Sequence, residues 1–194
     1  MRCSRCGYGG KAVRTYGYIA LALGWVIWVT PFVLAKRSGE PPRVIDRRAR
    51  WGLVLECIAY SVLWQGRFWE RELTAWQLGL AIVFFALAGL FSWSGTRALG
   101  RQLRLDAGLS ADHRLVTEGP YRVVRHPIYA SMLCLLWGTG FVISSPLLFA
   151  IATICFVAGT EIRVRTEERL LAARFGEQYT EYRRRVPAYV PFVR

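Results

Sequence analysis

The residues best placed to do chemistry in this sequence are its two histidines, which lie in one polar segment next to a long apolar stretch. His113 and His126 bracket a Gly-Pro-Tyr turn at 119–121. Because His126 precedes a proline, it is biased away from helix, whereas Pro127 suits the first turn of one. The apolar stretch is therefore predicted to be a helix whose first turn, which includes Tyr129, offers free N–H groups and partial positive charge.

An arginine and a glutamate one helical turn apart form a second candidate. Arg163 and Glu167 lie in the run 147–175, which contains no proline and only one glycine, Gly159. The run is predicted to be a single helix that ends at Gly176, and residues four apart share one face of it. This arginine and glutamate are either a solvated surface pair or a matched cation and anion for a ligand.

Glu56 is a third candidate, because it is the one charged residue of the apolar segment Trp51–Gln65. A charged residue inside a membrane helix is a functional-site hypothesis by default. At helical rise it lies about 7.5 Å from the end of the segment, where it could also reach water or pair with a loop arginine. Both interpretations stay open from the sequence alone.

Five apolar segments are expected to position these candidates. The segments are Gly17–Ala35, Trp51–Gln65, Trp76–Trp93, Ile128–Ile143 and Leu147–Gly159. A helix needs about 20 residues, within a range of about 17–25, to cross the hydrocarbon core. The first and third segments meet that length alone, and the others must include flanking residues or tilt. We therefore predict an all-α integral membrane protein with about five transmembrane helices.

The basic residues predict the orientation of these helices. The chain is 54% hydrophobic, yet it carries 26 Lys and Arg against 13 Asp and Glu. Residues 36–50, 95–127 and 160–194 hold 20 of the 26, which places that side in the cytosol by the positive-inside rule. Four basic residues before the first segment argue locally the other way. A nucleic-acid partner is not expected, because such a protein would not need long uncharged runs.

Several common site types are excluded by the motifs. The sequence has no G-x-G-x-x-G or P-loop pattern, no H-E-x-x-H and no serine–histidine–aspartate arrangement. The pair Cys3 and Cys6 is a single C-x-x-C without a second pair, which is too few ligands for a structural zinc site. No metal is therefore expected.

The polar motifs in combination resemble a known family. Residues 95–194 are similar to the isoprenylcysteine carboxyl methyltransferase family, which is related to membrane phospholipid methyltransferases. The residues that carry the resemblance are His113-Arg-Leu-Val, Gly119-Pro-Tyr121, Arg125-His126-Pro-Ile-Tyr129, Arg163-x-x-x-Glu167, Phe175-Gly176-x-x-Tyr179-x-x-Tyr182 and Arg185-Val-Pro-x-x-x-Pro191-Phe192. The resemblance divides the chain into a tail with three helices, 1–94, and a methyltransferase-like region, 95–194.

The resemblance implies a membrane enzyme that uses S-adenosylmethionine, bound by the cytosolic C-terminal part, and a lipophilic substrate that enters from the bilayer. Arg163 matches the position assigned to the substrate side, and Glu56 is added to that side as the charged residue of the second segment. The matching cofactor contacts are His113, Arg114, Leu115, Val116, Tyr121, His126, Pro127, Ile128, Tyr129 and Glu167. The sequence departs from the family at Ser131, where glycine is usual, and at Leu103, where many members have tryptophan.

The favoured reaction is carboxyl O-methylation of an isoprenylcysteine-like or other lipophilic acid. In this reaction Arg163 would bind the acceptor carboxylate and Glu167 the cofactor's ammonium group. The alternatives are N-methylation of a phospholipid headgroup and S-methylation of a small thiol, for which His126 or Glu56 would be the candidate base. A non-enzymatic membrane scaffold is the rival from another class, and the sequence does not predict an oligomeric state.

Overall fold

The computed structural model describes residues 6–35, 44–103, 108–109 and 114–190, and most of them are helical. The helices are α1 (Cys6–Leu34), α2 (Ala49–Leu63), α3 (Ala75–Leu99), α4 (Pro127–Ile143), α5 (Pro146–Phe175) and α6 (Glu177–Arg185), with 3-10 turns η1 (Phe68–Glu70), η2 (Gly100–Gln102) and η3 (Gly119–Arg122). The expected all-α membrane class is confirmed. The one departure is a two-residue antiparallel pair, β1 (Val44–Ile45) and β2 (Gly108–Leu109).

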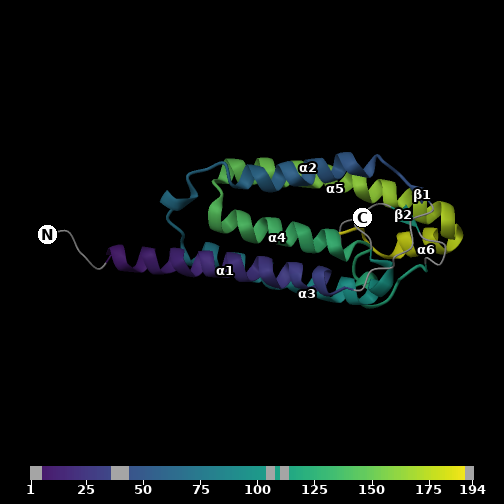
Figure 1. The fold of residues 1–194 in the computed structure, drawn as a ribbon, viewed down its shortest axis with the longest axis horizontal. Coiled ribbons are helices and arrows are strands. Elements are labelled where there is room, and N and C mark those ends of the chain that lie inside the picture. Colours follow the sequence, from purple (N-terminus) through teal and green to yellow (C-terminus); the bar gives the residue numbers. More distant parts are fainter. Residues whose placement is uncertain (1–5, 36–43, 104–107, 110–113, 191–194) are drawn as a thin grey trace.

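The five long helices run alternately up and down the molecule, so every second connection lies at the same end (Figure 1). Helix α2 packs along α5 on one side, α1 packs along α3 on the other, and α4 lies between these two layers. The tight turn at Ser144 and Ser145 makes α4 and α5 consecutive and antiparallel. However, α5 makes its main contact with α2 and only a smaller one with α4.

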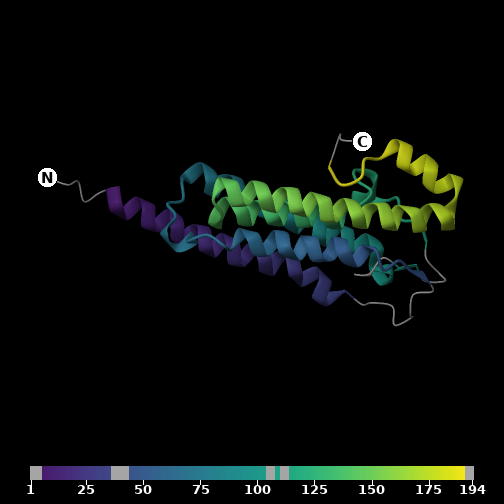
Figure 2. The same cartoon turned by 90° about the horizontal axis from the view of Figure 1, so that it is seen from above.

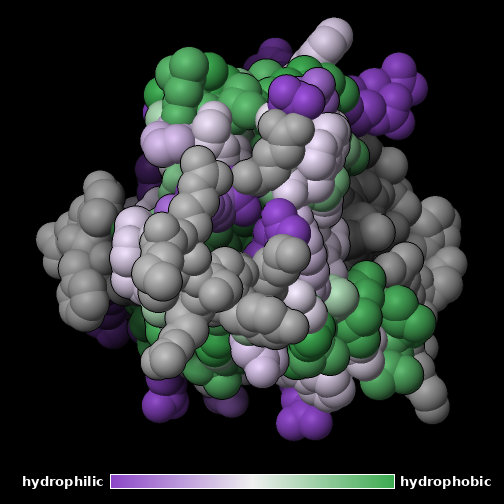
Figure 3. All heavy atoms as spheres, turned by 90° about the vertical axis from the view of Figure 1, so that its left-hand side faces the viewer, coloured by the Kyte–Doolittle hydropathy of each residue, from purple (hydrophilic) through white to green (hydrophobic). Residues whose placement is uncertain are grey.

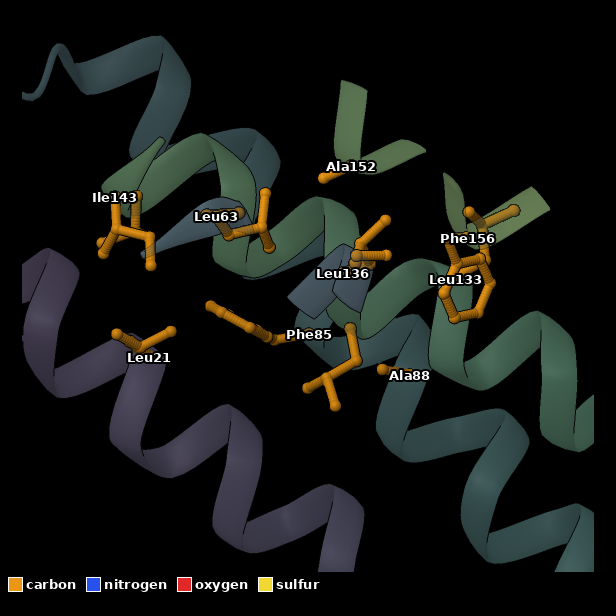
Figure 4. Packing of buried hydrophobic residues seen from close by; sticks show 13 residues of the cluster. Leu21, Leu63, Phe85, Ala88, Leu133, Leu136, Ile143, Ala152 and Phe156 are labelled. Carbon is orange, nitrogen blue, oxygen red and sulfur yellow. The ribbon is translucent and has the colours of Figure 1, made fainter. Parts of the chain in front are cut away.

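The apolar core is built around α4, whose residues are mostly buried. Figure 4 shows Leu133 and Leu136 of this helix among side chains of all four other long helices. Phe85 of α3 fills the space beside two glycines, because a Cβ placed on Gly24 or on Gly138 would lie within 2.8 Å of its ring. Small residues at these positions thus let α1, α3 and α4 approach each other closely.

The outer surfaces of the long helices are hydrophobic. Ile19, Val26 and Ile154 are all exposed although they belong to apolar helices. Hydrophobic residues also gather on the outer flanks of the bundle when it is seen from the end that carries the N-terminus (green in Figure 3). Such large apolar areas are what a lipid-facing surface requires and what a soluble monomer avoids.

Within the described residues, three helices are long and apolar enough to cross a membrane by length and composition, in α1, α3 and α5. Helix α4 is apolar but has only 17 residues, and α2 has 15. At about 1.5 Å per residue both fall short of the ~30 Å hydrocarbon core. The predicted number of five transmembrane helices therefore stays a proposal.

A proline inside α1 explains one contact between α1 and α3. Pro31 has no N–H, so the carbonyl of Ile27 loses the partner that it would have in a regular helix. The indole N–H of Trp93 donates to that carbonyl at 3.1 Å. An unsatisfied carbonyl is costly away from water, so this contact compensates for the proline and fixes α1 against α3.

The short elements after α1, α3 and α5 gather at one end of the bundle, opposite the N-terminus (Figure 2). The end is formed by the last turns of α5, by α6, by η3 and by the β1–β2 pair. The predicted single long helix is confirmed, because α5 continues unbroken to Phe175 and ends at Gly176, whose φ of 55° suits glycine. The chain then turns back through α6 toward the start of α4.

Candidate functional site

The start of α4 is fixed by the tail of the chain. The backbone N–H groups of Arg125 and His126 donate to the carbonyls of Pro187 and Ala188, at 2.9 and 2.8 Å. Pro127 has no N–H, so the remaining unbonded donors of the first turn belong to residues 128 and 129. Within the described residues no side chain caps this helix. These two N–H groups therefore form a small donor site at a positive helix end.

Arg163 of α5 is buried between α2 and α4. Its Nη1 donates to Glu56 Oε2 of α2 at 2.6 Å, and the other carboxylate oxygen of Glu56 accepts from the Thr160 hydroxyl at 3.1 Å. The Arg163 guanidinium also lies over the Tyr129 ring, 4.8 Å from its centre. Glu56 is only 1% exposed, so this is a buried ion pair and neither a solvated carboxylate nor a partner of a loop arginine.

Glu167, one turn beyond Arg163, joins the same group of side chains. It accepts a hydrogen bond from the Tyr129 hydroxyl, and its second oxygen lies 3.4 Å from His126 Nδ1. Its side chain keeps 27% of its surface exposed, far more than Glu56. The prediction that Arg163 and Glu167 share a face is confirmed, because both contact Tyr129. Glu167 is thus the carboxylate of this group that stays open to a ligand.

Glu168 faces a different set of partners and ties the tail to the site. Arg125 donates to its Oε1 through Nε and Nη2, at 2.9 and 2.7 Å, and Arg183 of α6 lies 3.2 Å from its other oxygen. Arg125 Nη1 also donates to the carbonyls of Arg183 and Val186. The Arg125–Glu168 pair therefore holds α6 and the tail against the start of α4.

His126 lies between the two adjacent glutamates. Its Nε2 is 3.5 Å from Glu168 Oε1, a contact whose geometry falls short of a hydrogen bond. Burial favours the neutral imidazole, but Glu167 and Glu168 outweigh burial and raise the pKa of His126 above its ordinary value. For the buried Tyr121 of η3, burial and then the charge of Glu167 raise the pKa of the phenol.

The structure brings together most, but not all, of the residues expected at a site. Those that converge are Glu56, Tyr121, His126, Pro127, Ile128, Tyr129, Arg163 and Glu167, from α2, η3, α4 and α5. Arg114, Leu115 and Val116 lie in a segment without regular secondary structure, in which the Arg114 N–H donates to Gln102 Oε1 at 2.8 Å. In the described part of the chain no hydrogen bond or ion pair joins these three residues to the buried charges. His113 lies outside the described residues, as do Cys3 and the side chain of Cys6.

Two residues of the site carry no individual signal in the sequence. Glu168 looks like one more charge on an amphipathic run, and Thr160 looks like an ordinary helix residue. Their roles depend on which way each faces, and the helix packing decides that. Tyr182 carries a partial signal through its spacing from Gly176, and its hydroxyl donates to the Tyr121 carbonyl at 2.6 Å.

Of the two departures from the family pattern, Ser131 points away from the site and Leu103 is buried. The Ser131 hydroxyl donates to the Ile128 carbonyl at 2.6 Å and accepts from the indole of Trp28 on α1 at 3.0 Å. Ser131 thus links α4 to α1 and does not narrow the space near Tyr129. Leu103 is 2% exposed and serves as a packing residue after α3.

The donor set at this end fits S-adenosylmethionine. Its ammonium group needs an anion, and Glu167 is a partly open carboxylate. Its carboxylate needs N–H donors, and the first turn of α4 offers those of Ile128 and Tyr129. Its aromatic base requires apolar and aromatic surface, and the ring of Tyr129 lies beside the same carboxylate.

The known proteins to which this chain is similar include methyltransferases. The family described as phospholipid methyltransferase matches residues 76–178. Similar proteins include protein-S-isoprenylcysteine O-methyltransferase B of Arabidopsis thaliana, 43% identical over 42% of this chain and 41% of its own length. The cobalt-zinc-cadmium resistance protein CzcN of Cupriavidus metallidurans is 32% identical over 73% of this chain and 62% of its own length. Methanethiol S-methyltransferase 2 of Bradyrhizobium diazoefficiens is 30% identical over 75% of this chain and 60% of its own length.

The chain belongs to the phospholipid methyltransferase family. The resemblance to isoprenylcysteine carboxyl methyltransferases is confirmed by relatives of that name from plants, fission yeast and a beetle. The matched region covers 41% to 62% of the length of the three relatives named above. Their names also cover two kinds of methyl acceptor, a prenylated cysteine carboxyl group and methanethiol.

Proposed function

We propose that this protein is a membrane methyltransferase that uses S-adenosylmethionine and methylates the carboxylate of an isoprenylcysteine-like or other lipophilic acid. The observation that carries the proposal is the convergence of Arg163 and Glu167 on Tyr129, beside the uncapped start of α4. A cation for one ligand and an anion for another lie one turn apart on one helix. A structural pair alone would not need this arrangement.

The residues around Glu167 would hold the cofactor. Glu167 binds the ammonium group, and the N–H groups of Ile128 and Tyr129 bind the carboxylate. The bound cofactor supplies a methyl group on a sulfonium, so a C–O bond to the acceptor forms while the C–S bond breaks and its electron pair stays on sulfur. Since such a displacement is in line, positioning of the two ligands accounts for most of the catalysis.

Arg163 would bind the acceptor carboxylate. A guanidinium matches a carboxylate with two parallel hydrogen bonds, and its burial strengthens them. No general base is required for an acceptor that is already ionised. The cation–π contact with Tyr129 fixes the plane of the guanidinium while the acceptor binds.

All five long helices are proposed to lie in the membrane, with the polar end in the cytosol. The alternating directions of the helices put the ends of α1, α3 and α5 at this end, and most Lys and Arg belong to the stretches 36–50, 95–127 and 160–194 of the sequence. Helices α2 and α4 are short because their ends at this side meet the polar site and not lipid. The exposed apolar flanks fit a lipophilic acceptor that reaches Arg163 from the bilayer, among membrane lipids.

One observation favours a second acceptor class. Arg163 already has a carboxylate partner in Glu56, which could also serve as the base for a thiol. S-methylation of a small thiol is therefore the second candidate, in line with the methanethiol methyltransferases among the relatives. N-methylation of a phospholipid headgroup is the third, and it has only the family's description in its favour.

Calorimetry on the detergent-solubilised protein tests the proposal. S-adenosylmethionine should bind with one site per chain, and a prenylcysteine analogue should be converted to its methyl ester when both are present. A parallel assay with an alkanethiol compares the two leading acceptors. If the folded protein does not bind the cofactor, the proposed methyltransferase function is refuted. A non-enzymatic membrane scaffold would then be the remaining hypothesis.

A further inference from the structure

The position on Arg163 that an acceptor carboxylate needs is already taken by a carboxylate of the protein. We propose that Glu56 is an internal stand-in for the acceptor: an acid acceptor displaces Glu56 from Arg163, and Glu56 takes up one proton from solvent as it leaves. Glu56 is thereby a selectivity residue, which makes acceptor binding a proton-coupled exchange. This inference rests on the proposed function, because it assumes that acids bind at Arg163.

The pair is built in a way that stability alone does not explain. Glu56 and Arg163 lie on different helices, 107 residues apart, and are 1% and 7% exposed. A buried ion pair is often no more stable than apolar residues of similar size, because both charges lose their hydration. In a membrane protein such a pair more often marks a substrate or ion path. Its position within one turn of Glu167 places it at the candidate site.

Thr160 lets Glu56 exist in two protonation states. Its hydroxyl donates to the Glu56 carboxylate at 3.1 Å, and a hydroxyl can equally accept a hydrogen bond from a protonated carboxyl group. The contact therefore survives when Glu56 gains a proton. A protonated Glu56 remains buried without a charge, whereas an ionised one that has lost Arg163 would be strongly unfavourable.

The charges around Glu56 require this proton when an acid binds. With both carboxylates ionised, Arg163 would face two anions, and Glu167 lies close enough to repel both. Among the residues that the structure describes, titratable and charged groups reach Glu56 from all three helices around it. They are Arg163 and Glu167 of α5, Tyr129 of α4 and Tyr60 of α2 itself. Arg163 is the one cation in that set, so it neutralises only one of two carboxylates near it.

The exchange also accounts for release of the product. A methyl ester is neutral and cannot hold Arg163 as a carboxylate does. Glu56 then loses its proton and pairs with Arg163 again, which removes the ester from the guanidinium. The site consequently prefers an acid over its ester, although both have the same lipophilic tail.

Equilibrium binding without cofactor tests the exchange. The wild-type protein should bind a prenylcysteine acid with an affinity that falls about tenfold per pH unit above neutrality, the slope for uptake of one proton. Its methyl ester should show no such slope. In Glu56→Gln the slope for the acid should vanish, and at pH ~8 the variant should bind the acid at least about tenfold more tightly than wild type.

Glu161→Gln is the matched control, because this residue lies on the same helix and pairs with Arg165 at 2.7 Å on the surface. It should keep the wild-type slope and affinity. Acid binding to Glu56→Gln that is as weak as in wild type, or that keeps the slope, would overturn the exchange. If Glu56→Gln does not fold, calorimetry of wild type in two buffers of different ionisation enthalpy decides the matter, since it counts the protons taken up. One proton for the acid and none for the ester supports the exchange, and none for both refutes it.

These experiments distinguish failure of the proton-coupled exchange from failure of the proposed methyltransferase function. A protein that takes up a proton with the acid but never binds S-adenosylmethionine would retain the exchange and refute the proposed function. A protein that methylates the acid but takes up no proton when the acid binds would retain the proposed function and refute the exchange. Methylation of an alkanethiol that is lost in Glu56→Gln, without any acid binding, would show that Glu56 is a base and would also refute the exchange.

Discussion

Gly52 of α2 and Gly159 of α5 lie directly against each other. A Cβ on Gly52 would lie 2.5 Å from the Gly159 carbonyl oxygen, and a Cβ on Gly159 would lie 2.6 Å from that of Gly52. Each glycine precedes a member of the buried ion pair, Glu56 or Arg163, by one helical turn. The close approach of the two backbones is therefore what brings this carboxylate and this guanidinium within reach.

We predict that Gly52→Ala or Gly159→Ala pushes α2 away from α5 and breaks the ion pair. Because the obstructing atoms include a backbone carbonyl oxygen in each case, the helices must move, at a cost of about 1–3 kcal/mol in the free energy of unfolding. Thermal unfolding in detergent measures this loss. Gly79→Ala in α3 is the matched control, since a Cβ there meets nothing within 4 Å. It should be neutral or slightly stabilising, because alanine favours helix; equal losses in all three variants would contradict the prediction.

Glu167→Gln should weaken the binding of S-adenosylmethionine by roughly 1.5–3 kcal/mol, the usual contribution of a hydrogen bond to a charged group. The fold should be retained, because the side chain is partly open and its hydrogen bond with Tyr129 can persist. Calorimetric titration measures the change in affinity. Glu177→Gln, at the exposed start of α6, should bind like wild type. An unchanged affinity in Glu167→Gln would reduce Glu167 to a structural partner of His126.

The environment of His126 predicts that stability falls as pH rises. Glu167 and Glu168 overcome the effect of burial and raise the pKa of His126 above that of an unfolded histidine, about 6.5. The protonated form thus stabilises the folded state fully below that unfolded pKa, and the contribution is lost as pH rises through the folded pKa. The melting temperature should therefore decrease from pH ~6 upward, and His126→Gln should remove this dependence. His113→Gln, which removes the other histidine, should keep it.

The charge pattern predicts where the ends of the protein lie. Residues 36–50, 95–127 and 160–194 hold 20 of the 26 Lys and Arg, so a reporter fused after Arg194 should be cytosolic. A reporter inserted in 66–75, at the other end of the bundle, should not be. The first helix is the sensitive point, because basic residues also precede it. A C-terminal reporter found on the far side of the membrane would contradict the prediction. It would place the site away from the cytosol, where the cofactor is made.

Local features of the site were predictable from the sequence. Pro127 at the first turn of α4, the unbroken α5 and its end at Gly176 all follow from backbone preferences within a few residues. The common face of Arg163 and Glu167 follows from helical spacing alone. Each of these expectations concerns residues that are close together in the chain.

Contacts between distant helices were not predictable. The sequence shows that Glu56 is a charge in an apolar segment, but not that its partner is Arg163, because antiparallel α2 and α5 meet through glycines that resemble any other small residues. Glu168 was missed for the same reason. Only the return of α6 shows that it faces Arg125 and Arg183 while its neighbour Glu167 faces His126.

Arg163→Lys distinguishes the acceptor classes. For an acid acceptor, lysine keeps the charge but loses the fork that matches two carboxylate oxygens, so turnover of a prenylcysteine analogue should fall while cofactor affinity stays nearly constant. For an amine acceptor, a cation beside the protonated headgroup would repel it, and the arginine would instead bind the lipid phosphate. The variant should then raise KM for phosphorylated lipids specifically. Arg165→Lys is the control, because Arg165 lies on the same helix and is 68% exposed. Full activity of Arg163→Lys on every acceptor would show that the arginine is structural and would remove the main reason for preferring an acid.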